Sequence, residues 1–82
     1  MKIEVRLHGA LGRYHPADTT RLGAFELEVA DEATIATVIE QLGIPAGWAR
    51  GLFVNERPSE PGDRLASGDR LVLFPPVGGG TR

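Results

Sequence analysis

The residues with the clearest chemical use stand at the C-terminal end of the sequence, which closes in FPPVGGGTR (residues 74–82). Pro75 and Pro76 have no backbone N–H donor and a fixed φ, so strand pairing cannot extend through them. The glycines at 78–80 then remove every Cβ from the segment. The six residues from Pro75 to Gly80 span at most about 20 Å when fully extended. This pattern predicts an arm with a stiff base, which can enter a narrow channel of another protein and present a terminal carboxylate to an active site there.

Other residues that could do chemistry are few and scattered. The sequence has two histidines, His8 and His15, and no acidic pair stands beside either at metal-ligand spacing. Asp63 and Asp69 fall within turn signals, where aspartate is favoured because it bonds to nearby backbone. The glycine run does not have the context of a phosphate-binding loop, which needs a helix after it. The absence of cysteine excludes disulfides, iron–sulfur clusters and thiol catalysis. We therefore predict a protein that is not an enzyme, holds no metal and binds no cofactor stably.

Composition places the chain among ordinary globular domains and argues against two classes of partner, nucleic acids and membranes. Its 82 residues suffice for one domain, with 41% hydrophobic and 24% charged residues. The net charge is −2, the arginines are scattered and Lys2 is the single lysine, so the basic stripe that nucleic-acid binding needs is missing. No apolar run approaches the ~20 residues of a membrane span, and the N-terminus alternates instead of forming a signal peptide. We predict a cytoplasmic protein with neither nucleic acid nor membrane as a partner.

Four strands are predicted from the apolar pattern, and they must position the arm. Residues 2–8 and 25–29 alternate polar and apolar positions and are expected to pair as a hairpin. Residues 52–55 form a short strand that leads into a turn or brief edge strand. Residues 70–74 include four consecutive apolar positions, which is typical of a central strand covered on at least one face. The connection 9–23 is rich in turn-forming residues and is expected to be partly irregular.

One amphipathic helix is predicted after the hairpin. Apolar residues recur at i, i+3, i+4 and i+7 between residues 35 and 42, which is the spacing of one helical face. Thr34 stands at the N-cap position, and Gly43 stands where the helix should end. Trp48 lies in the turn-rich link 44–50 and is expected to pack in the core or against the helix.

The order of these elements predicts an α+β fold, in which a mixed sheet of four to five strands wraps around one main helix. The helix would connect the second strand to the third as a crossover, and the last strand would insert beside the first. In the hairpin, the outward glutamates of the second strand are expected to face Lys2 and Arg6. We expect a domain at residues 1–74 and a flexible tail at 75–82.

The segment GDRLVLFPPVGGG (residues 68–80) closely resembles the C-terminal signature of the MoaD/ThiS sulfur carriers. The likeness extends to the predicted helix, which has Thr34 at its start and Leu-Gly at its end. It also includes the strand end at Val54-Asn55 and Leu65, three residues before Gly68-Asp69. Proteins of this family are ubiquitin-like, have the β-grasp fold and end in Gly-Gly. The resemblance implies a ubiquitin-like β-grasp fold and a carrier that acts together with partner enzymes.

The chemistry that the resemblance implies takes place at the end of the chain. Gly79 and Gly80 correspond to the diglycine of the family, and Gly80 would bear the sulfur. A ubiquitin-activating-type adenylyltransferase, which supplies ATP and Mg²⁺, would adenylate the Gly80 carboxylate, and sulfur would convert it into a thiocarboxylate. A synthase subunit similar to the large subunit of molybdopterin synthase would accept this sulfur, in molybdopterin, tungstopterin or thiamine biosynthesis. Thr81 and Arg82 depart from the family pattern and keep Gly80 in a peptide bond, so a peptidase is expected to remove them.

Partner recognition is expected on the last strand and at the start of the arm. If the strand alternates, Val72 and Phe74 point outward. They would then lie beside Arg6 and His8 of the first strand, and an exposed aromatic ring there would anchor an interface. The alternative is that Phe74 belongs to the core. The arm residues expected to join this interface are Pro75, Pro76, Val77 and Gly78.

Two functions from other classes also fit the sequence. The first is a ubiquitin-like modifier that forms isopeptide bonds between Gly80 and lysines of target proteins. The second is a β-grasp interaction module with an inert tail.

Overall fold

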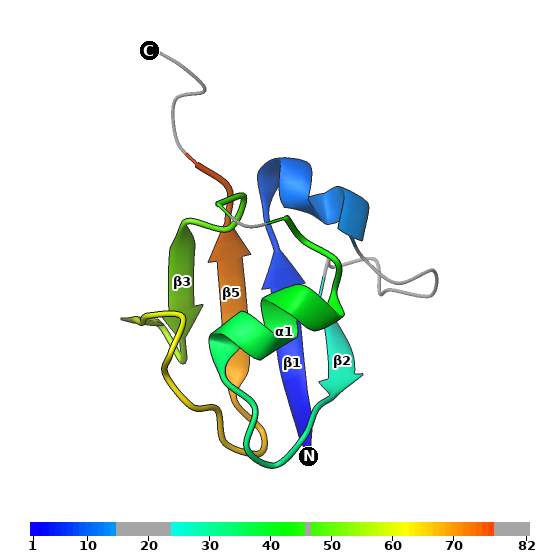
Figure 1. Cartoon of the computed structure of the whole chain (residues 1–82), viewed down its shortest axis with the longest axis vertical. Coiled ribbons are helices and arrows are strands. Elements are labelled where there is room, and N and C mark those ends of the chain that lie inside the picture. Colours follow the sequence, from blue (N-terminus) through cyan, green and yellow to red (C-terminus); the bar gives the residue numbers. More distant parts are fainter. Residues whose placement is uncertain (15–23, 46, 77–82) are drawn as a thin grey trace.

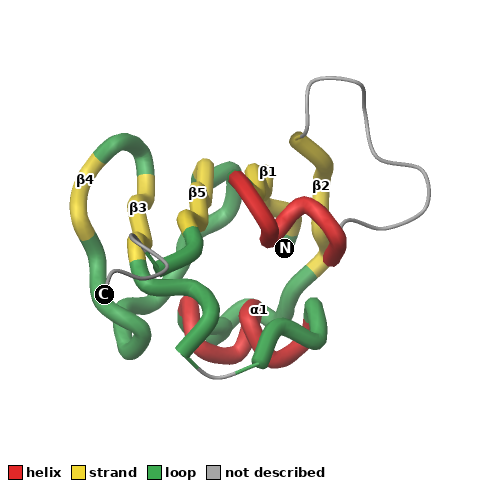
Figure 2. The backbone as a smooth tube through the Cα atoms, turned by 90° about the horizontal axis from the view of Figure 1, so that it is seen from above, coloured by secondary structure: helices red, strands yellow, loops and turns green. Residues whose placement is uncertain are grey.

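The computed structural model describes residues 1–14, 24–45 and 47–76, which form a five-stranded sheet with one α-helix against it (Figure 1). Figure 2 shows the strands in one layer and the α-helix in a second layer on one side of them. Among the residues that the structure describes, no helix has the length and apolar run that a membrane crossing needs. In chain order the elements are β1 (Lys2–Leu7), the 3-10 helix η1 (Gly9–Tyr14), β2 (Ala24–Glu28), α1 (Ile35–Gln41), β3 (Gly51–Val54), β4 (Arg57–Pro58) and β5 (Arg70–Phe74).

The strands are hydrogen-bonded in the order β2-β1-β5-β3-β4. β1 and β5 run parallel, with Val5 opposite Leu71 and Leu7 opposite Leu73. The other neighbouring pairs are antiparallel, so the sheet is mixed. β5 lies in the centre of the sheet beside β1, as its run of apolar residues predicted. The predicted α+β class, a mixed sheet with one main helix, is confirmed.

Alternation along the strands places one set of aliphatic side chains in the core between the sheet and α1. Leu71 and Leu73 of β5 are each 0% exposed, and Ile35 and Val38 of α1 are buried to the same extent. Burial of one such side chain stabilises the fold by about 1.5–3 kcal/mol, so this aliphatic layer holds helix and sheet together. The buried core consists of Ile3, Val5, Leu7, Leu11, Phe25, Val29, Ala33, Ile35, Val38, Ile44, Leu52, Leu65, Leu71 and Leu73.

The helix begins at its predicted N-cap residue. The Thr37 N–H donates to Oγ1 of Thr34 at 3.3 Å, and the Thr34 N–H donates to Oγ1 of Thr37 at 2.9 Å. The first two N–H groups inside the helix donate to the carbonyl oxygens of Asp63 and Pro61, at 3.1 and 2.9 Å. These donors have no partner within a helix, so the loop after β4 satisfies them and holds the helix start.

The helix ends at Gln41, and the predicted terminator Gly43 stands directly after the C-cap Leu42. Gly43 has a φ of +80°, a left-handed conformation that glycine adopts at little cost. Its N–H donates to the Glu40 carbonyl at 3.0 Å, and the Ile44 N–H donates to the Ile39 carbonyl at 3.1 Å. The two bonds form a Schellman motif, which turns the chain and brings Ile44 into the core.

Trp48 lies on the surface, so the expectation that it packs in the core or against the helix is wrong. Its side chain is 42% exposed. The chain turns directly after α1, and the Trp48 N–H bonds to the Pro45 carbonyl at 3.1 Å. Ile44 at the start of this link is buried, and the larger indole ring stays outside.

The connection after β1 begins with the short helix η1, which the sequence pattern did not predict. Leu11 of η1 is fully buried, and its N–H donates to the His8 carbonyl at 3.1 Å. A single apolar residue among glycines gives no periodic signal, so this core residue was missed. His15 and residues 16–23 lie outside the described part of the chain.

Charge pairing in the β1–β2 hairpin follows the prediction at one end only. Lys2 Nζ lies 4.0 Å from a carboxylate oxygen of Glu26. Arg6 lies opposite Ala24 in the register, and its Nη2 is 4.0 Å from the carboxylate of Glu4 on its own strand. The expected pairing of Arg6 with a glutamate of β2 is therefore wrong, because the register places Glu26 opposite Glu4.

Candidate functional site at the base of the C-terminal arm

The end of β5 positions the candidate site. β5 passes between β1 and β3, and the chain leaves the sheet after Phe74, at the end opposite the N-terminus (Figure 1). The His8 N–H donates to the Leu73 carbonyl at 3.0 Å, and the Arg50 N–H donates to the Phe74 carbonyl at 2.9 Å. Proline follows at positions 75 and 76 and offers no N–H to continue the ladder. Backbone pairing therefore holds the strand on both sides up to Phe74 and stops there.

Phe74 points away from the core and is 38% exposed, whereas the preceding Leu73 is fully buried. Its ring stacks on the His8 imidazole, with centroids 4.4 Å apart and planes inclined by 14°. The Phe53 ring meets it edge-on, at a centroid distance of 5.7 Å and an angle of 86°. A contact of this kind contributes about 0.5–1.5 kcal/mol beyond area burial, so the ring is held in place although it is exposed. The predicted outward position of Phe74 is confirmed, and the alternative that it belongs to the core is wrong.

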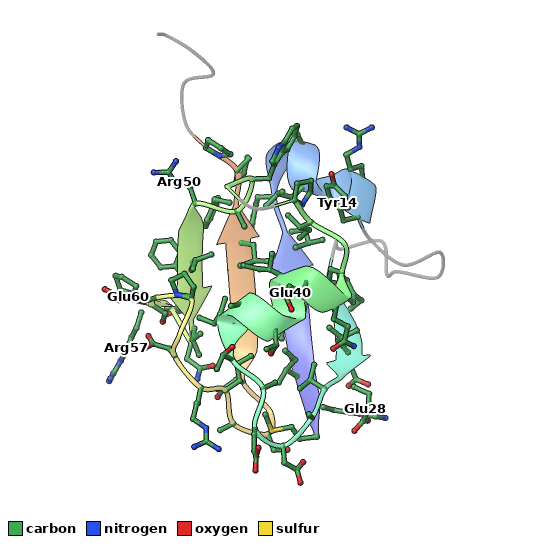
Figure 3. All side chains as sticks on the ribbon, in the orientation of Figure 1. Tyr14, Glu28, Glu40, Arg50, Arg57 and Glu60 are labelled. Carbon is green, nitrogen blue, oxygen red and sulfur yellow. The ribbon has the colours of Figure 1, made fainter. Side chains whose placement is uncertain are left out.

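A hollow of about 500 Å³ lies beside the exposed ring. Phenylalanine and proline rings supply most of its lining. Arg50 stands directly before β3, at the end of the molecule where the arm leaves the sheet (Figure 3). Exposed aromatic and proline rings next to the base of an arm suit an interface with another protein. The residues that line the hollow are Arg50, Gly51, Phe53, Phe74, Pro75 and Pro76.

The same face of the sheet becomes charged with distance from the arm. Val72 is half-buried and lies opposite Arg6 on β1 and Phe53 on β3. Beyond them the carboxylate of Glu4 lies 4.0 Å from Arg6 and 3.8 Å from Arg70. The Nε atom of Arg6 is buried and has no hydrogen-bond partner. Four predicted interface residues therefore share one face, and their role in partner binding stays a prediction: Arg6, His8, Val72 and Phe74.

Of the other predicted site residues, Pro75 and Pro76 line the hollow. Val77, Gly78, Gly79 and Gly80 lie outside the described residues, as do Thr81 and Arg82. The predicted division into a domain at 1–74 and a tail at 75–82 likewise stays a prediction.

The two aspartates considered from the sequence serve turns. Asp63 Oδ2 accepts the Glu60 N–H at 3.0 Å, and Asp69 Oδ2 accepts the Ala66 N–H at 2.8 Å. These are the local backbone bonds for which aspartate is favoured in turns. Within the ranges that the structure describes, no group of three or more histidine, aspartate or glutamate side chains could hold a metal ion.

Sequence reasoning missed three residues at the base of the arm. Phe53 alternates with the buried Leu52, so the strand pattern contained the signal for an outward ring there. Gly9 and Gly51 gave no such signal, because a glycine beside a strand also fits an ordinary turn. In the described residues the arrangement offers an exposed apolar surface and a fixed base for the arm.

Comparison with known proteins gives one family match and several solved structures of similar fold. The model of the ThiS family matches residues 15–80. The chain has no significant match among curated proteins. SAMP1 from Haloferax volcanii, a small archaeal modifier protein, aligns with a TM-score of 0.71 and 21% identity, over 98% of this chain and 100% of its own. The solution structure of the Haloferax volcanii HVO 2177 protein aligns with a TM-score of 0.74 and 21% identity, over 98% of this chain and 87% of its own.

A third solved structure comes from a complex. One chain of the protein–protein complex of subunits 1 and 2 of molybdopterin-converting factor from Helicobacter pylori aligns with a TM-score of 0.58 and 22% identity. The alignment covers 98% of this chain and 100% of that one. Identities of 21 to 22% concern the fold, and the predicted ubiquitin-like β-grasp fold is confirmed. The family match covers most of the sequence and ends at Gly80. The chain therefore belongs to the ThiS family.

Proposed function

We propose that this chain is a sulfur carrier whose Gly80 is adenylated and converted into a thiocarboxylate, which donates sulfur in molybdopterin biosynthesis or in the related tungstopterin or thiamine pathways. The observation that carries the proposal is the end of β5. This central strand stops at an exposed Phe74, and two prolines and three glycines follow within the next six residues. The family match supports Gly80 as the working end, since it stops at that residue.

The chemistry needs three steps, each with a defined leaving group. A peptidase first hydrolyses the Gly80–Thr81 bond, because a peptide carbonyl has no carboxylate to adenylate. The Gly80 carboxylate then attacks the α-phosphorus of ATP, bound with Mg²⁺ on an adenylyltransferase, and pyrophosphate leaves. Hydrosulfide attacks the acyl carbon of this adenylate, AMP leaves and a proton is released, and the thiocarboxylate remains. The chain supplies the carbonyl carbon, and the partner enzymes supply the catalytic groups, ATP and Mg²⁺.

Two partners follow from this chemistry. The ubiquitin-activating-type adenylyltransferase and the sulfur-accepting synthase subunit both need the arm in their active sites, so both would dock at its base. The Helicobacter pylori neighbour supports the synthase partner, since it belongs to a complex of two subunits. We assign the docking surface to the apolar face around Val72, Phe53 and Phe74 and to the hollow beside it. A cytoplasmic location is part of the same proposal.

A ubiquitin-like modifier is the second candidate. The likeness to SAMP1, a small archaeal modifier protein, favours it. The same adenylate of Gly80 would then be attacked by a lysine of a target protein, with AMP as the leaving group and an isopeptide bond as the product. Because Lys2 is the single lysine of the sequence, we expect the modifier to act on other proteins and not to build chains on itself.

Mass spectrometry separates these functions. A protein that ends at Gly80 is incubated with ATP, Mg²⁺, sulfide and the adenylyltransferase of the same organism. The carrier proposal predicts the mass gain of one oxygen replaced by one sulfur, and the protein that ends at Arg82 serves as the unreactive control. In a second incubation, cell extract is added and its proteins are digested. Branched peptides in which a lysine of an extract protein is linked to the C-terminal residues of this chain would instead indicate the modifier function. Absence of both products contradicts both functions and leaves the interaction module with an inert tail.

A further inference from the structure

Gly51 lets two strands approach closely at the base of the arm. It lies opposite Phe74 in the antiparallel register of β3 and β5. A Cβ added at Gly51 would lie 3.1 Å from Cβ and 3.4 Å from Cδ2 of Phe74. Opposed Cβ atoms in antiparallel sheets are usually about 4.5–5.5 Å apart. The Phe74 side chain therefore lies directly over the bare backbone of Gly51, and no larger residue fits there without a shift.

Gly9 has the same relation to Pro75, the residue that follows Phe74. A Cβ added at Gly9 would lie 3.0 Å from Cγ and 3.4 Å from Cδ of Pro75. Gly9 also has a φ of +58°, in the left-handed region that residues with a Cβ rarely adopt. The pyrrolidine ring of Pro75 is rigid, so it cannot turn aside as a long side chain would.

Together these residues form a seat for the base of the arm, which we call the tail seat (His8, Gly9, Gly51 and Phe53). Phe74 stacks on His8 of the β1 side and touches Phe53 and Gly51 of the β3 side. Pro75 then lies against Gly9 on the β1 side. Phe74 is thus held from both neighbouring strands and Pro75 from the β1 side, at the point where backbone pairing stops. The tail seat therefore fixes the direction in which the chain leaves the sheet.

We propose that Gly51 and Gly9 are positioning residues, which set the exit direction of the arm so that a docked partner receives the C-terminal glycine at its reacting centre. This inference rests on the proposed function, since it takes the arm as the part that is delivered. The five residues from Pro76 to Gly80 span at most about 17 Å, so the place and direction in which the chain leaves the sheet set the region that the C-terminal glycine can reach. Misplacement of reacting groups by 1 Å can slow a reaction by about a hundredfold.

The chain offers test variants and matched controls of the same kind. Gly51→Ala adds a methyl group against Phe74, and Gly9→Ala adds one against Pro75. Gly12→Ala and Gly62→Ala are the controls, because a Cβ at either position meets nothing within 4 Å and neither glycine has a positive φ. Gly9→Ala also serves as the second variant if Gly51→Ala does not fold.

The first measurement does not depend on any partner. In the full chain, nuclear Overhauser contacts and ring-current shifts between His8 and Phe74 report the stacked pair. We expect Gly51→Ala to lose these contacts while the signals of the core residues stay in place. Both control variants should keep them.

The second measurement is ATP–pyrophosphate exchange by the adenylyltransferase of the same organism, with protein that ends at Gly80. We expect Gly51→Ala to lower kcat by at least about tenfold, because the carboxylate is misplaced. Its KM should rise too, because the displaced Phe74 belongs to the docking surface. Gly9→Ala acts on Pro75 and leaves Phe74 in place, so it should lower kcat with a KM close to that of the unaltered sequence. A variant that is only less stable, yet folded at the assay temperature, keeps its kcat.

Each outcome decides the inference. Loss of the His8–Phe74 contacts together with the fall in kcat supports it. Retention of those contacts in both seat variants overturns the seat. Loss of the contacts with an unchanged kcat, or an equal fall in kcat for the Gly12→Ala control, overturns the positioning role. If the unaltered sequence ending at Gly80 gives no exchange, the proposed function fails, and with it the delivery role, whereas the magnetic resonance data still decide whether the glycines fix the base of the arm.

Discussion

Replacement of Phe74 by alanine separates an interface anchor from a core residue. The ring is 38% exposed, and its main contacts are the stacked His8 and the edge of Phe53. Loss of these two aromatic pairs should lower the free energy of unfolding by about 1–3 kcal/mol, since each pair contributes about 0.5–1.5 kcal/mol. A buried phenylalanine would cost about 3–5 kcal/mol instead. We therefore expect a folded Phe74→Ala protein, with a modest shift in its urea midpoint.

The effect on partner binding should be larger than the effect on stability. Aromatic anchors at the centre of an interface contribute about 2 kcal/mol or more. That value corresponds to a loss of about 30-fold in affinity for the adenylyltransferase. Isothermal titration calorimetry on the protein that ends at Gly80 measures it directly.

Trp48→Ala provides the matched control for Phe74→Ala. Trp48 is the other large exposed hydrophobic side chain among the described residues, at 42%, and it does not line the hollow. We expect its removal to leave the affinity nearly unchanged. Equal losses of affinity for the two variants, or a loss for Trp48→Ala alone, would refute the assignment of the docking surface to the base of the arm.

Three further predictions concern the fold. The pKa of the Met1 amino group is raised above its ordinary value of 8.0, chiefly by its hydrogen bond to Glu28. Its stabilising effect is complete below pH 8.0 and is lost as the pH rises through the raised pKa, so urea titrations should show a fall in stability there that an N-terminally acetylated chain lacks. Thr34→Ala removes the helix N-cap and should lower the free energy of unfolding by about 1 kcal/mol, measured by urea denaturation; an unchanged midpoint would argue against the cap. Glu56→Gly should raise the midpoint, because Glu56 has a φ of +72° in the two-residue turn between β3 and β4, where glycine is favoured; a lower midpoint would contradict this.

Much of the fold could be predicted from the sequence, because its signals are local. The apolar alternation of β1 indicated a strand with one buried face, and the apolar run of β5 indicated a central strand; both are found. Thr34 and Gly43 marked the helix ends because capping depends on residues next to the helix itself. The outward position of Phe74 followed from the same alternation.

The parts that could not be predicted depend on distant contacts. Trp48 was expected inside because it is large and apolar, yet the turn after α1 brings Ile44 into the core instead. The pairing of Arg6 failed because it depends on the register between β1 and β2, which the pattern of either strand does not fix. The roles of Gly9 and Gly51 lie in what approaches them from β5 and the arm, and only the folded structure reveals that approach.

The central claim is that Gly80, freed of Thr81 and Arg82, carries the sulfur. The most direct measurement is the intact mass of the protein purified from the cells that produce it, under conditions that preserve thiocarboxylates. We predict a population that ends at Gly80 and carries one sulfur in place of a carboxyl oxygen. A protein that ends uniformly at Arg82 in cells actively making the cofactor would contradict the account.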